Sequence, residues 1–522
     1  MPRYRAVPSL QSLSLKGIGS LVESLQPILV YNTLLTSDSQ SIVSNLQQQL
    51  DCLTNLLTSH VPFYLYDSMA VEVLNSVTKL VEITKKKYRP FAQISEFLME
   101  MNIVLSLTEV VLTSHMKRLD FSLWPKMMRY ILFKKLDQTN GLEYLNLGSC
   151  TGVWRTSDND RFMINTMSQM RNLKFLCLCF DCTDMIIQAI SENCPYIQSL
   201  DVTSSKSVSD RSVTALANCK QLTELFLHQT SVTTQGLADV IMGLPRLQNI
   251  GRCDEFGYIL THLRQIPNYN EELPLKKVHT RDMTNVNMHV LVNTFPHLES
   301  FSLFLNDNEI IDLRILISLN NLKELKILSG AFHAHFLGEL LEARGCLLET
   351  LYLEQMDEMD LNVVILISQC CPRLKQLVIY NCDFRDSLTN PVYLRSFKVE
   401  PFFNLEKLTW IVDGALSILE FILMNAFNLK STYLGSSTAI NHASIVKILG
   451  KNPLRQLEEL KILYSHDMNM RTVQLILASC PKLTALSELE GWQGIQQAEL
   501  KTFRRHITSS NFDLDLRPTL SL

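Results

Sequence analysis

The sequence has no long hydrophobic run and no excess of positive charge. None of its segments approaches the roughly 18–20 apolar residues that a membrane-spanning helix needs, and the N-terminus carries Arg3 and Arg5 without a continuous apolar stretch after them. A formal net charge of −4 gives no basic surface for nucleic acid or anionic lipid. We therefore expect a soluble protein of the cytoplasm and/or nucleus that binds neither nucleic acid nor membrane.

The sequence also lacks the short motifs of enzyme active sites. It contains no Gly-rich phosphate-binding loop, no nucleophile elbow and no HExxH motif. The acidic residues Asp357, Glu358 and Asp360 fall in one loop between repeats, where they are typical of surface charge. We expect no enzyme, no catalytic residues and no cofactor.

The cysteines do not suggest a disulfide framework. Their number is odd, at 13, and they include the adjacent pair Cys370–Cys371, which is more typical of reduced, buried thiols. Cys177-x-Cys179-x-x-Cys182 resembles half of a zinc motif, but no second cysteine pair follows at the required spacing. His333 and His335 have no acidic ligand nearby in the sequence. We therefore predict no metal site.

A leucine pattern recurs over most of the chain. Leu142-x-x-Leu145-x-Leu147 states it clearly, and Met116-x-x-Leu119-x-Phe121 is an earlier, weaker copy. Further copies begin 24 to 31 residues apart, except for one gap of 51 that Leu275-x-x-Val278 partly fills. These copies begin at Leu173, Ile197, Leu222, Leu247, Leu298, Leu322, Leu348, Leu374, Leu405, Leu429, Leu457 and Leu483. The period predicts an α/β leucine-rich-repeat solenoid, with a parallel β-sheet on its concave face and helices on its convex face, preceded by an α-helical N-terminal region.

The repeat pattern also assigns residues to the open face of the sheet. The leucines point into the solenoid, and the residues between them point away from it. The resulting candidates for binding a protein substrate are aromatic or charged: Tyr144, Phe226, His228, Lys326, Tyr352, Glu354 and Tyr380.

The segment from Ser9 to Leu25 has two interpretations. As a helix it follows Pro8 and ends before Pro27, and Leu10, Ser14, Ile18 and Leu21 lie on one face. Leu10-x-x-Leu13-x-Leu15 also fits a leucine-rich-repeat strand. The sequence leaves open whether this segment is a docking helix or part of a capping repeat.

Two short motifs resemble the VHL-type box of ubiquitin-ligase receptors. Ser9-Leu10-x-x-x-Ser14-x-x-x-Ile18 resembles the elongin-binding box, with Ser14 where the family has cysteine. Val61-Pro62-x-x-Leu65-x-x-x-Met69 matches the cullin-selecting box. Cys-Pro pairs such as Cys371-Pro372 precede several repeats, as in the cysteine-containing repeats of such receptors. Together they resemble the elongin B/C–Cullin-2 substrate receptors of the zyg-eleven/zer-one group.

The resemblance implies a function and a set of partners. Elongin C, with elongin B, would bind Leu10, Ser14, Ile18 and Leu21, whereas Cullin-2 would be selected by Val61, Pro62, Leu65 and Met69. The repeats would hold a protein substrate. Members of that group continue into an armadillo-like domain that reads N-terminal glycine, and we do not expect that specificity from the repeats.

The motifs, the repeat pattern and the polar C-terminal segment together divide the chain into four parts. Residues 1–90 would be a helical docking region, 91–140 a helical lead-in and cap, 141–490 the repeat array, and 491–522 a C-terminal cap with a loose tail. Two alternatives remain: a non-ligase leucine-rich-repeat scaffold, and an F-box receptor of a Skp–cullin ligase. For the latter, we find no Leu-Pro-led F-box with its distal Trp in the first hundred residues.

Overall fold

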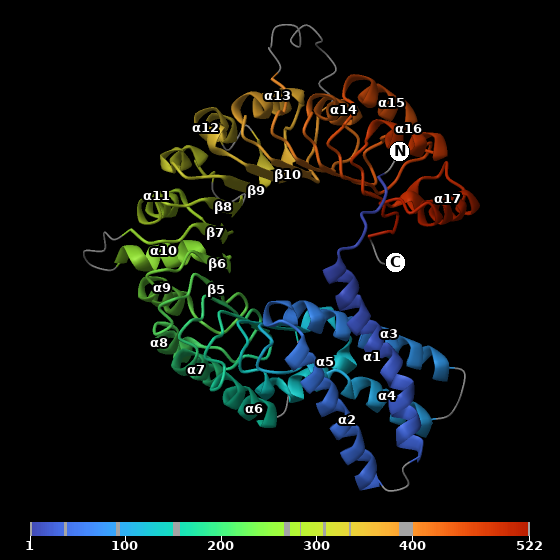
Figure 1. Cartoon of the computed structure of the whole chain (residues 1–522). Helices are drawn as coiled ribbons and strands as arrows, with labels where there is room; N and C mark the ends of the chain where they lie inside the picture. Colours follow the sequence, from blue (N-terminus) through green and yellow to red (C-terminus); the bar gives the residue numbers. More distant parts are fainter. Residues whose placement is uncertain are drawn as a thin grey trace. The chain divides into compact units, whose positions relative to one another are not determined.

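The computed structural model describes residues 3–35, 39–89, 94–149, 157–265, 272–281, 283–305, 310–332, 336–385 and 400–519 (Figure 1). The chain divides into two compact units. The N-terminal unit is residues 8–251, and the C-terminal unit is residues 252–522 together with residues 1–7. His333 and His335 lie outside the described residues.

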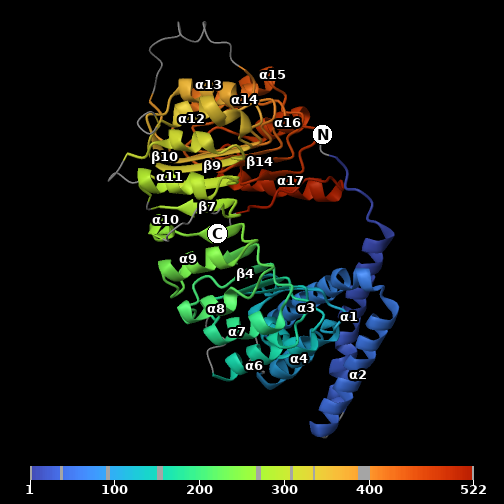
Figure 2. The ribbon, with the colours of Figure 1, turned by 90° about the vertical axis from the view of Figure 1, so that its left-hand side faces the viewer.

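The leucine motifs of the N-terminal unit form short parallel strands that pair in sequence order. Each strand begins two residues after the first apolar residue of its motif, as Tyr144 follows Leu142. The strands are β1 (Arg118–Asp120), β2 (Tyr144–Ser149), β3 (Phe175–Cys179), β4 (Ser199–Asp201), β5 (Glu224–Phe226) and β6 (Asn249–Arg252). Helices cover one face of this sheet: α5 (Lys126–Lys134), α6 (Ser157–Met167), α7 (Asp184–Asn193), α8 (Val213–Leu216) and α9 (Thr234–Gly243) (Figures 1 and 2).

The C-terminal unit continues the same strand–helix alternation. Its strands are β7 (Lys277–Thr280), β8 (Ser300–Phe304), β9 (Glu324–Ala331), β10 (Thr350–Asp357), β11 (Gln376–Tyr380), β12 (Lys407–Ile411), β13 (Ser431–Leu434), β14 (Glu459–Ile462) and β15 (Ala485–Ser487). Its repeat helices are α10 (Phe256–Gln265), α11 (Asn285–Thr294), α12 (Leu337–Arg344), α13 (Leu361–Cys370), α14 (Leu416–Asn425), α15 (His442–Lys451) and α16 (Met470–Ser479). The predicted α/β leucine-rich-repeat fold is confirmed, and the repeat helices cover one face of its parallel sheet in each unit and leave the other face open (Figure 1).

The core consists of the repeated leucines and the residues at the helix ends. Leu145, Leu325 and Leu377 are fully buried at equivalent strand positions. Cys194, Cys371 and Cys480 follow α7, α13 and α16 and are buried too, and burial raises the pKa of each thiol to about 12. These cysteines are therefore neutral packing residues, as the sequence predicted.

Charges alternate along one edge of the C-terminal unit, at the residue just after the opening leucine of each motif. Backbone hydrogen bonds place neighbours side by side, as from the Glu349 N–H to the Lys323 carbonyl at 2.7 Å. Glu299 lies between two lysines, with Nζ–carboxylate distances of 3.1 Å to Lys276 and 2.9 Å to Lys323. The ladder reads Lys276, Glu299, Lys323, Glu349, Lys375, Glu406, Lys430 and Glu458. Its alternation favours one stacking order of repeats.

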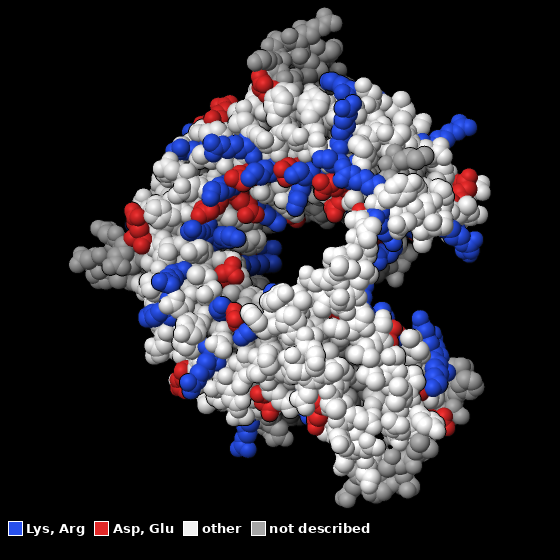
Figure 3. Space-filling model, viewed as in Figure 1, with Lys and Arg blue, Asp and Glu red and all other residues white. Residues whose placement is uncertain are grey.

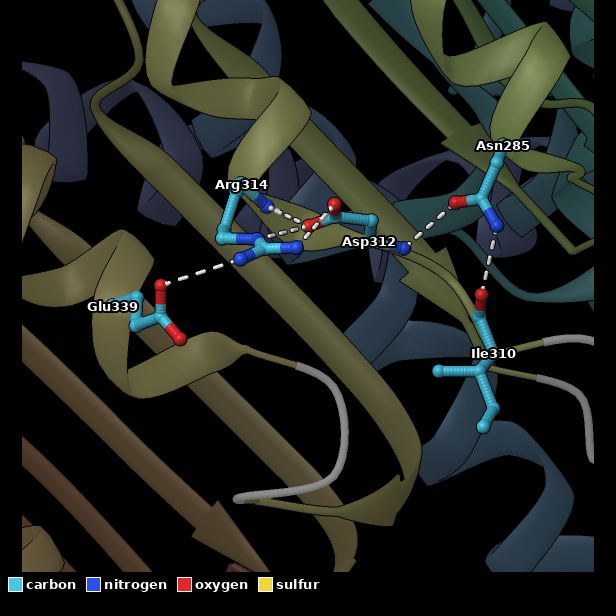
Figure 4. A network of polar contacts seen from close by, with 5 residues as sticks. All are labelled: Asn285, Ile310, Asp312, Arg314 and Glu339. Carbon is cyan, nitrogen blue, oxygen red and sulfur yellow. Dashed lines mark hydrogen bonds and ion pairs between the residues drawn. The ribbon is translucent and has the colours of Figure 1, made fainter.

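One repeat of the C-terminal unit carries a 3-10 helix, η6 (Leu313–Ser318), between β8 and β9. A polar network holds it in place (Figure 4). Asn285 accepts from the Asp312 N–H at 2.7 Å and donates to the Ile310 carbonyl at 2.8 Å. Arg314 pairs with Asp312 at 2.9 Å and approaches Glu339 of α12 at 3.7 Å. Side-chain contacts to both flanking helices thus stabilise the short element.

The last part of the chain is packed. Helix α17 (Gln497–Ser509) is followed by a bridge from Asp515 to Ala485 of β15, and Leu514 and Leu516 are buried. The expected loose tail is therefore wrong for the described residues after α17. An N-terminal arm also covers this cap, because Tyr4 stacks on Phe512 with ring centroids 5.0 Å apart.

In the described part of the region before the repeats of the N-terminal unit, four helices are found: α1 (Leu10–Leu35), α2 (Ser39–His60), α3 (Tyr66–Tyr88) and α4 (Ile94–Ser106). A 3-10 turn, η1 (Phe63–Leu65), leads into α3. Among the described residues, no helix combines the length and apolarity needed to cross a membrane.

Candidate functional site

The segment that the sequence left ambiguous is a helix. Ser9 starts it, because its hydroxyl accepts a hydrogen bond from the Ser12 N–H at 3.1 Å and its carbonyl accepts from the Leu13 N–H at 2.9 Å. The interpretation of Leu10-x-x-Leu13-x-Leu15 as a repeat strand is wrong. The expected end before Pro27 is wrong as well, since α1 continues to Leu35.

One face of α1 packs on α3. Val22 and Leu29 are buried on this face, on either side of Pro27, and they hold the helix together across the backbone hydrogen bond that proline cannot make. Gly19 lies directly against α3, where an added Cβ would be 2.7 Å from the Ser76 hydroxyl. Glu23 pairs with Lys79 at 3.1 Å further along. The two helices therefore run in the same direction, and their N-terminal ends lie at the same end of the bundle.

The opposite face of α1 is an exposed apolar surface. Leu10 is 83% exposed and Leu21 is 39% exposed, and Ile28 and Tyr31 continue the row toward the C-terminus. Spacings of four and three residues alternate along it, which is the seam pattern of a helix that packs against another helix. We call this row the α1 seam: Leu10, Ser14, Gly17, Leu21, Ser24, Ile28 and Tyr31. Of the predicted elongin-docking residues, Leu10, Ser14 and Leu21 lie on it, whereas Ile18 is half-buried at its border.

Gly17 has no structural role within the described chain. A Cβ added there would meet nothing within 4 Å, in contrast to Gly19. Glycine within a helix costs about 0.5–1 kcal/mol relative to alanine. Gly17 therefore leaves a side-chain-free position in the middle of the seam.

The surface around the seam carries almost no charge. Helix α1 has two charged residues, Lys16 and Glu23, and α2 has one, Asp51. Figure 3 shows white atoms over most of both helices, while blue and red atoms gather over the repeats. An uncharged apolar strip on a surface helix is typical of a protein interaction site.

A nearly buried carboxylate anchors α1 to the helices behind it. Glu100 of α4 is 6% exposed and accepts hydrogen bonds from Lys87 at 2.6 Å, Tyr88 at 2.9 Å and Gln26 of α1 at 3.0 Å. Burial alone would raise the pKa of Glu100, but the donors from Lys87 and Tyr88 outweigh it and hold the pKa below its ordinary value. The seam is thus presented by a fixed helix.

The predicted cullin-docking residues divide between core and surface. Met69 is fully buried in α3 and is not accessible to a partner, while Val61 and Leu65 are half-buried. Pro62 is exposed, and so are two neighbours that the motif does not include. Phe63 is 77% exposed and Tyr64 is 71% exposed, with their rings edge to face and centroids 6.0 Å apart. The exposure of both rings could not be read from the sequence, because Tyr66 in the same segment is fully buried.

The start of α3 is fixed to the first repeat. Asp67 accepts hydrogen bonds from the Lys117 N–H at 2.9 Å and the Arg118 N–H at 3.3 Å, at the start of β1. The buried Tyr66 hydroxyl donates to the Val111 carbonyl at 3.3 Å and accepts from Thr113 at 2.9 Å. Helical region and repeats form one unit through these contacts.

Three predicted substrate-face residues lie in the N-terminal unit. Tyr144 stacks on Phe175 of β3, with centroids 4.2 Å apart and planes 7° apart, and the Arg118 guanidinium lies 3.6 Å from its centroid. Phe226 packs over Gly251, and His228 is half-buried. The structure therefore brings Tyr144 together with Phe175, a residue that the sequence reading missed.

The other four lie in the C-terminal unit and form one cluster. The Lys326 ammonium is 3.8 Å from the Tyr352 ring centroid and 3.8 Å from the Glu354 carboxylate. Tyr380 pairs in register with Glu354 on the next strand. Burial and the Glu354 carboxylate raise the pKa of Tyr352, which keeps its hydroxyl protonated. A second lysine–tyrosine pair lies on β13 and β14, where the Lys461 ammonium is 4.6 Å from the Tyr433 ring centroid.

Comparison with known proteins gives similarity in structure alone. No family model matches the chain, and no curated protein matches it. A leucine-rich-repeat protein of Leptospira interrogans is 15% identical, covering 80% of this chain and 91% of that chain with a TM-score of 0.36. The yeast complex of Rad7 and Elc1 contains a chain that is 13% identical, covering 71% of this chain and 90% of that chain with a TM-score of 0.34. Neither likeness bears on function at these values.

Proposed function

We propose that this chain is the substrate-recognition subunit of an elongin B/C–Cullin-2 ubiquitin ligase. In this proposal α1 binds elongin C, the turn before α3 contacts Cullin-2, and the open sheet faces hold a protein substrate in the cytoplasm and/or nucleus. The subunit has no catalytic residues of its own. It contributes to ubiquitin transfer by holding the substrate near the charged E2 enzyme.

The observation that carries the proposal is the α1 seam. Leu10 and Leu21 are large aliphatic side chains that the described chain leaves exposed on a well-anchored helix. Burial of each against a partner contributes about 1.5–3 kcal/mol. A small residue between them, Gly17, permits close helix approach. The half-buried Ile18 would add its outer edge to the contact.

The serine at position 14 is compatible with burial in such an interface. A hydroxyl on a helix satisfies its donor on the carbonyl of the preceding turn. Neighbouring serines of α1 do this already: Ser20 donates to the Lys16 carbonyl at 3.1 Å and Ser24 donates to the Leu21 carbonyl at 2.8 Å. Ser14 can therefore replace the cysteine of the family motif without leaving a buried donor unpaired.

The proposed cullin contact uses the exposed part of the second motif. Pro62, with the outer edges of Val61 and Leu65, would lie at the interface together with Phe63 and Tyr64. Met69 would act from the core by fixing the start of α3. Since α1 and α3 begin at the same end of the bundle, both partners would be held at that end.

A non-ligase scaffold is the second candidate, and one observation favours it. The buried face of α1 packs on α3, and α3 is tied to β1, so the four helices also cap the repeats. A cap needs no apolar residues on its outer face. The exposed apolar residues of the α1 seam are therefore expected for a ligase receptor but not for a simple cap.

The test is co-purification of the full chain with elongin B and elongin C. We expect wild-type protein to retain both, and Leu21→Glu and Leu10→Glu to lose them, because an unpaired charge would be buried against elongin C. Leu10 begins the helix, where a carboxylate is favourable, so its substitution should not disturb folding. Leu123→Glu is the matched control, since Leu123 is an exposed leucine outside α1. Folded wild-type protein that recovers no elongin would refute the proposal.

A further inference from the structure

A cluster of metal-ligating side chains lies on the open face of the N-terminal unit, away from the α1 seam. Cys177 and Cys179 are alternate residues of β3, so both point to the same side of the sheet. Asp201 of β4 pairs in register with Cys177, which places its carboxylate on the same side. In the described part of the chain, these three side chains bring their ligand atoms close enough together to hold one metal ion.

The distances between the three ligand atoms fit one ion. The two Sγ atoms are 3.5 Å apart, and Cys177 Sγ is 3.8 Å from Asp201 Oδ2. All three ligand atoms lie within 4.8 Å of one another. In a tetrahedral zinc site with Zn–S bonds of about 2.3 Å, neighbouring ligands are separated by about 3.8 Å. A zinc ion would therefore need only small side-chain movements.

From this geometry we infer that Cys177, Cys179 and Asp201 form a zinc-binding site. The donors are two thiolates and one carboxylate, a set that zinc accepts. On binding, each thiol gives its proton to solvent and each sulfur donates an electron pair to Zn²⁺, with no change of oxidation state. A water molecule, or a side chain of a bound protein, completes the tetrahedron from the open side.

The ligand set differs from the one that the sequence motif suggests. Cys182, the third cysteine of Cys177-x-Cys179-x-x-Cys182, is buried, and its Sγ hydrogen-bonds the Thr183 carbonyl at 3.8 Å. It is not part of the cluster, and the third ligand instead comes from the next strand. A disulfide between Cys177 and Cys179 is disfavoured, because alternate residues of an extended strand have Cα atoms about 6.6 Å apart, at the upper end of the range that disulfides span, which would strain the bond.

The site would link two strands beside an aromatic surface. Phe175, which stacks with Tyr144, precedes Cys177 by two residues on the same face of β3. Zinc would cross-link β3 to β4 next to this stack and would leave one coordination position facing a bound protein. The inference does not depend on elongin or cullin binding.

The test uses the full-length protein, reduced and stripped of metal with a chelator. After addition of zinc chloride and gel filtration, we expect one zinc ion per chain by mass spectrometry. Cobalt chloride should give the thiolate-to-cobalt absorption of a tetrahedral site. The double variant Cys177→Ser, Cys179→Ser should lose both signals, and Asp201→Asn should weaken zinc binding.

Two controls make the outcome specific. Cys52→Ser removes an exposed thiol of α2, and Cys182→Ala removes the buried third cysteine of the motif; both should keep the zinc. The inference is overturned if wild-type protein binds no zinc, if the double variant still binds it, or if folded Cys182→Ala loses it. Circular dichroism checks folding of each variant. Should the double variant not fold, wild-type stoichiometry and Asp201→Asn decide.

Discussion

Gln26 of α1 donates a 3.0 Å hydrogen bond to Glu100 of α4, and Glu100 is nearly buried. The carboxylate receives two further donors, from Lys87 and Tyr88 of α3. Three helices are thus joined at one anion. This contact fixes the rotation of α1 about its axis and, with it, the direction in which the seam faces.

The first prediction concerns the pH dependence of this anchor. The folded pKa of Glu100 is lower than the ordinary value of 4.5, so its stabilising effect is present above that pH and is lost as pH falls through the lower folded value. Glu100→Gln should lower the free energy of unfolding at pH 7 by about 1–3 kcal/mol, since the hydrogen bonds involve charged groups. Urea unfolding should show this difference shrinking below pH 4.5. A constant difference across pH would contradict the assignment.

The second prediction compares substitutions at two glycines of α1, one expected to weaken elongin binding and the other expected to affect the packing of α1. Gly17→Gln should stabilise the helix by about 0.5–1 kcal/mol, because glycine is unfavourable there and nothing lies within 4 Å of the new Cβ. It should nevertheless weaken elongin binding, since the side chain would occupy the seam. Gly19→Ala should keep elongin binding but should not gain this stability, because the new Cβ would lie 2.7 Å from the Ser76 hydroxyl and the crowding, about 1–3 kcal/mol, offsets or exceeds the gain in helix propensity.

Thermal unfolding measures the stability of the two glycine variants. Their elongin binding is measured by pull-down at a temperature where both are folded. If Gly17→Gln binds elongin as wild-type does, the seam is not the docking surface. If Gly19→Ala loses binding while folded, α1 acts through its position on α3 and the seam residues need not touch the partner.

The strands could be predicted from sequence because each repeat is a local pattern. Leu348 and Leu351 already determine where β10 begins and which residues it buries. Outward residues such as Tyr352 follow by alternation. Tyr433 and Phe175 likewise occupy outward-facing positions of their strands, so the repeat pattern was sufficient to predict them as well.

Other features depend on packing between distant segments. Pro27 should end a helix, yet buried Val22 and Leu29 keep α1 intact on both sides of it. The spacing of Val61, Leu65 and Met69 correctly gives a shared face, but spacing cannot tell whether that face meets a partner or the core, and Met69 meets the core. Asp201 is 24 residues from Cys177, so only the register of β3 and β4 brings them together.

The third prediction concerns the Lys–Glu ladder. Glu299 contacts a lysine on each side, and exposed ion pairs of this kind contribute about 0.2–1 kcal/mol each. Glu299→Lys should destabilise the C-terminal unit by more than Glu299→Gln, because it replaces two attractions with two repulsions. The excess should decrease in 1 M salt, where the Debye length is about 3 Å.

The alternation adds a stricter expectation. Combining Glu299→Lys with Lys323→Glu should not restore stability, because the new lysine still faces Lys276 and the new glutamate faces Glu349. Chemical unfolding at low and high salt measures each variant. Full rescue by the double substitution would show that the outer neighbours, Lys276 and Glu349, contribute nothing to the stability that Glu299 and Lys323 provide.

The last prediction concerns the exposed aromatic pair before α3. Phe63→Ser combined with Tyr64→Ser should change the free energy of unfolding by no more than about 0.5 kcal/mol, since both rings are largely exposed. The same variant should keep elongin B and elongin C but lose Cullin-2 in a pull-down, because Phe63 and Tyr64 are the exposed aromatic side chains of the second motif and aromatic residues are enriched among those that dominate binding energy. Leu123→Ser, an exposed leucine elsewhere, should keep all three partners. Retention of Cullin-2 by the double variant would exclude the pair from the contact, and loss of elongin as well would place both rings in the elongin interface instead.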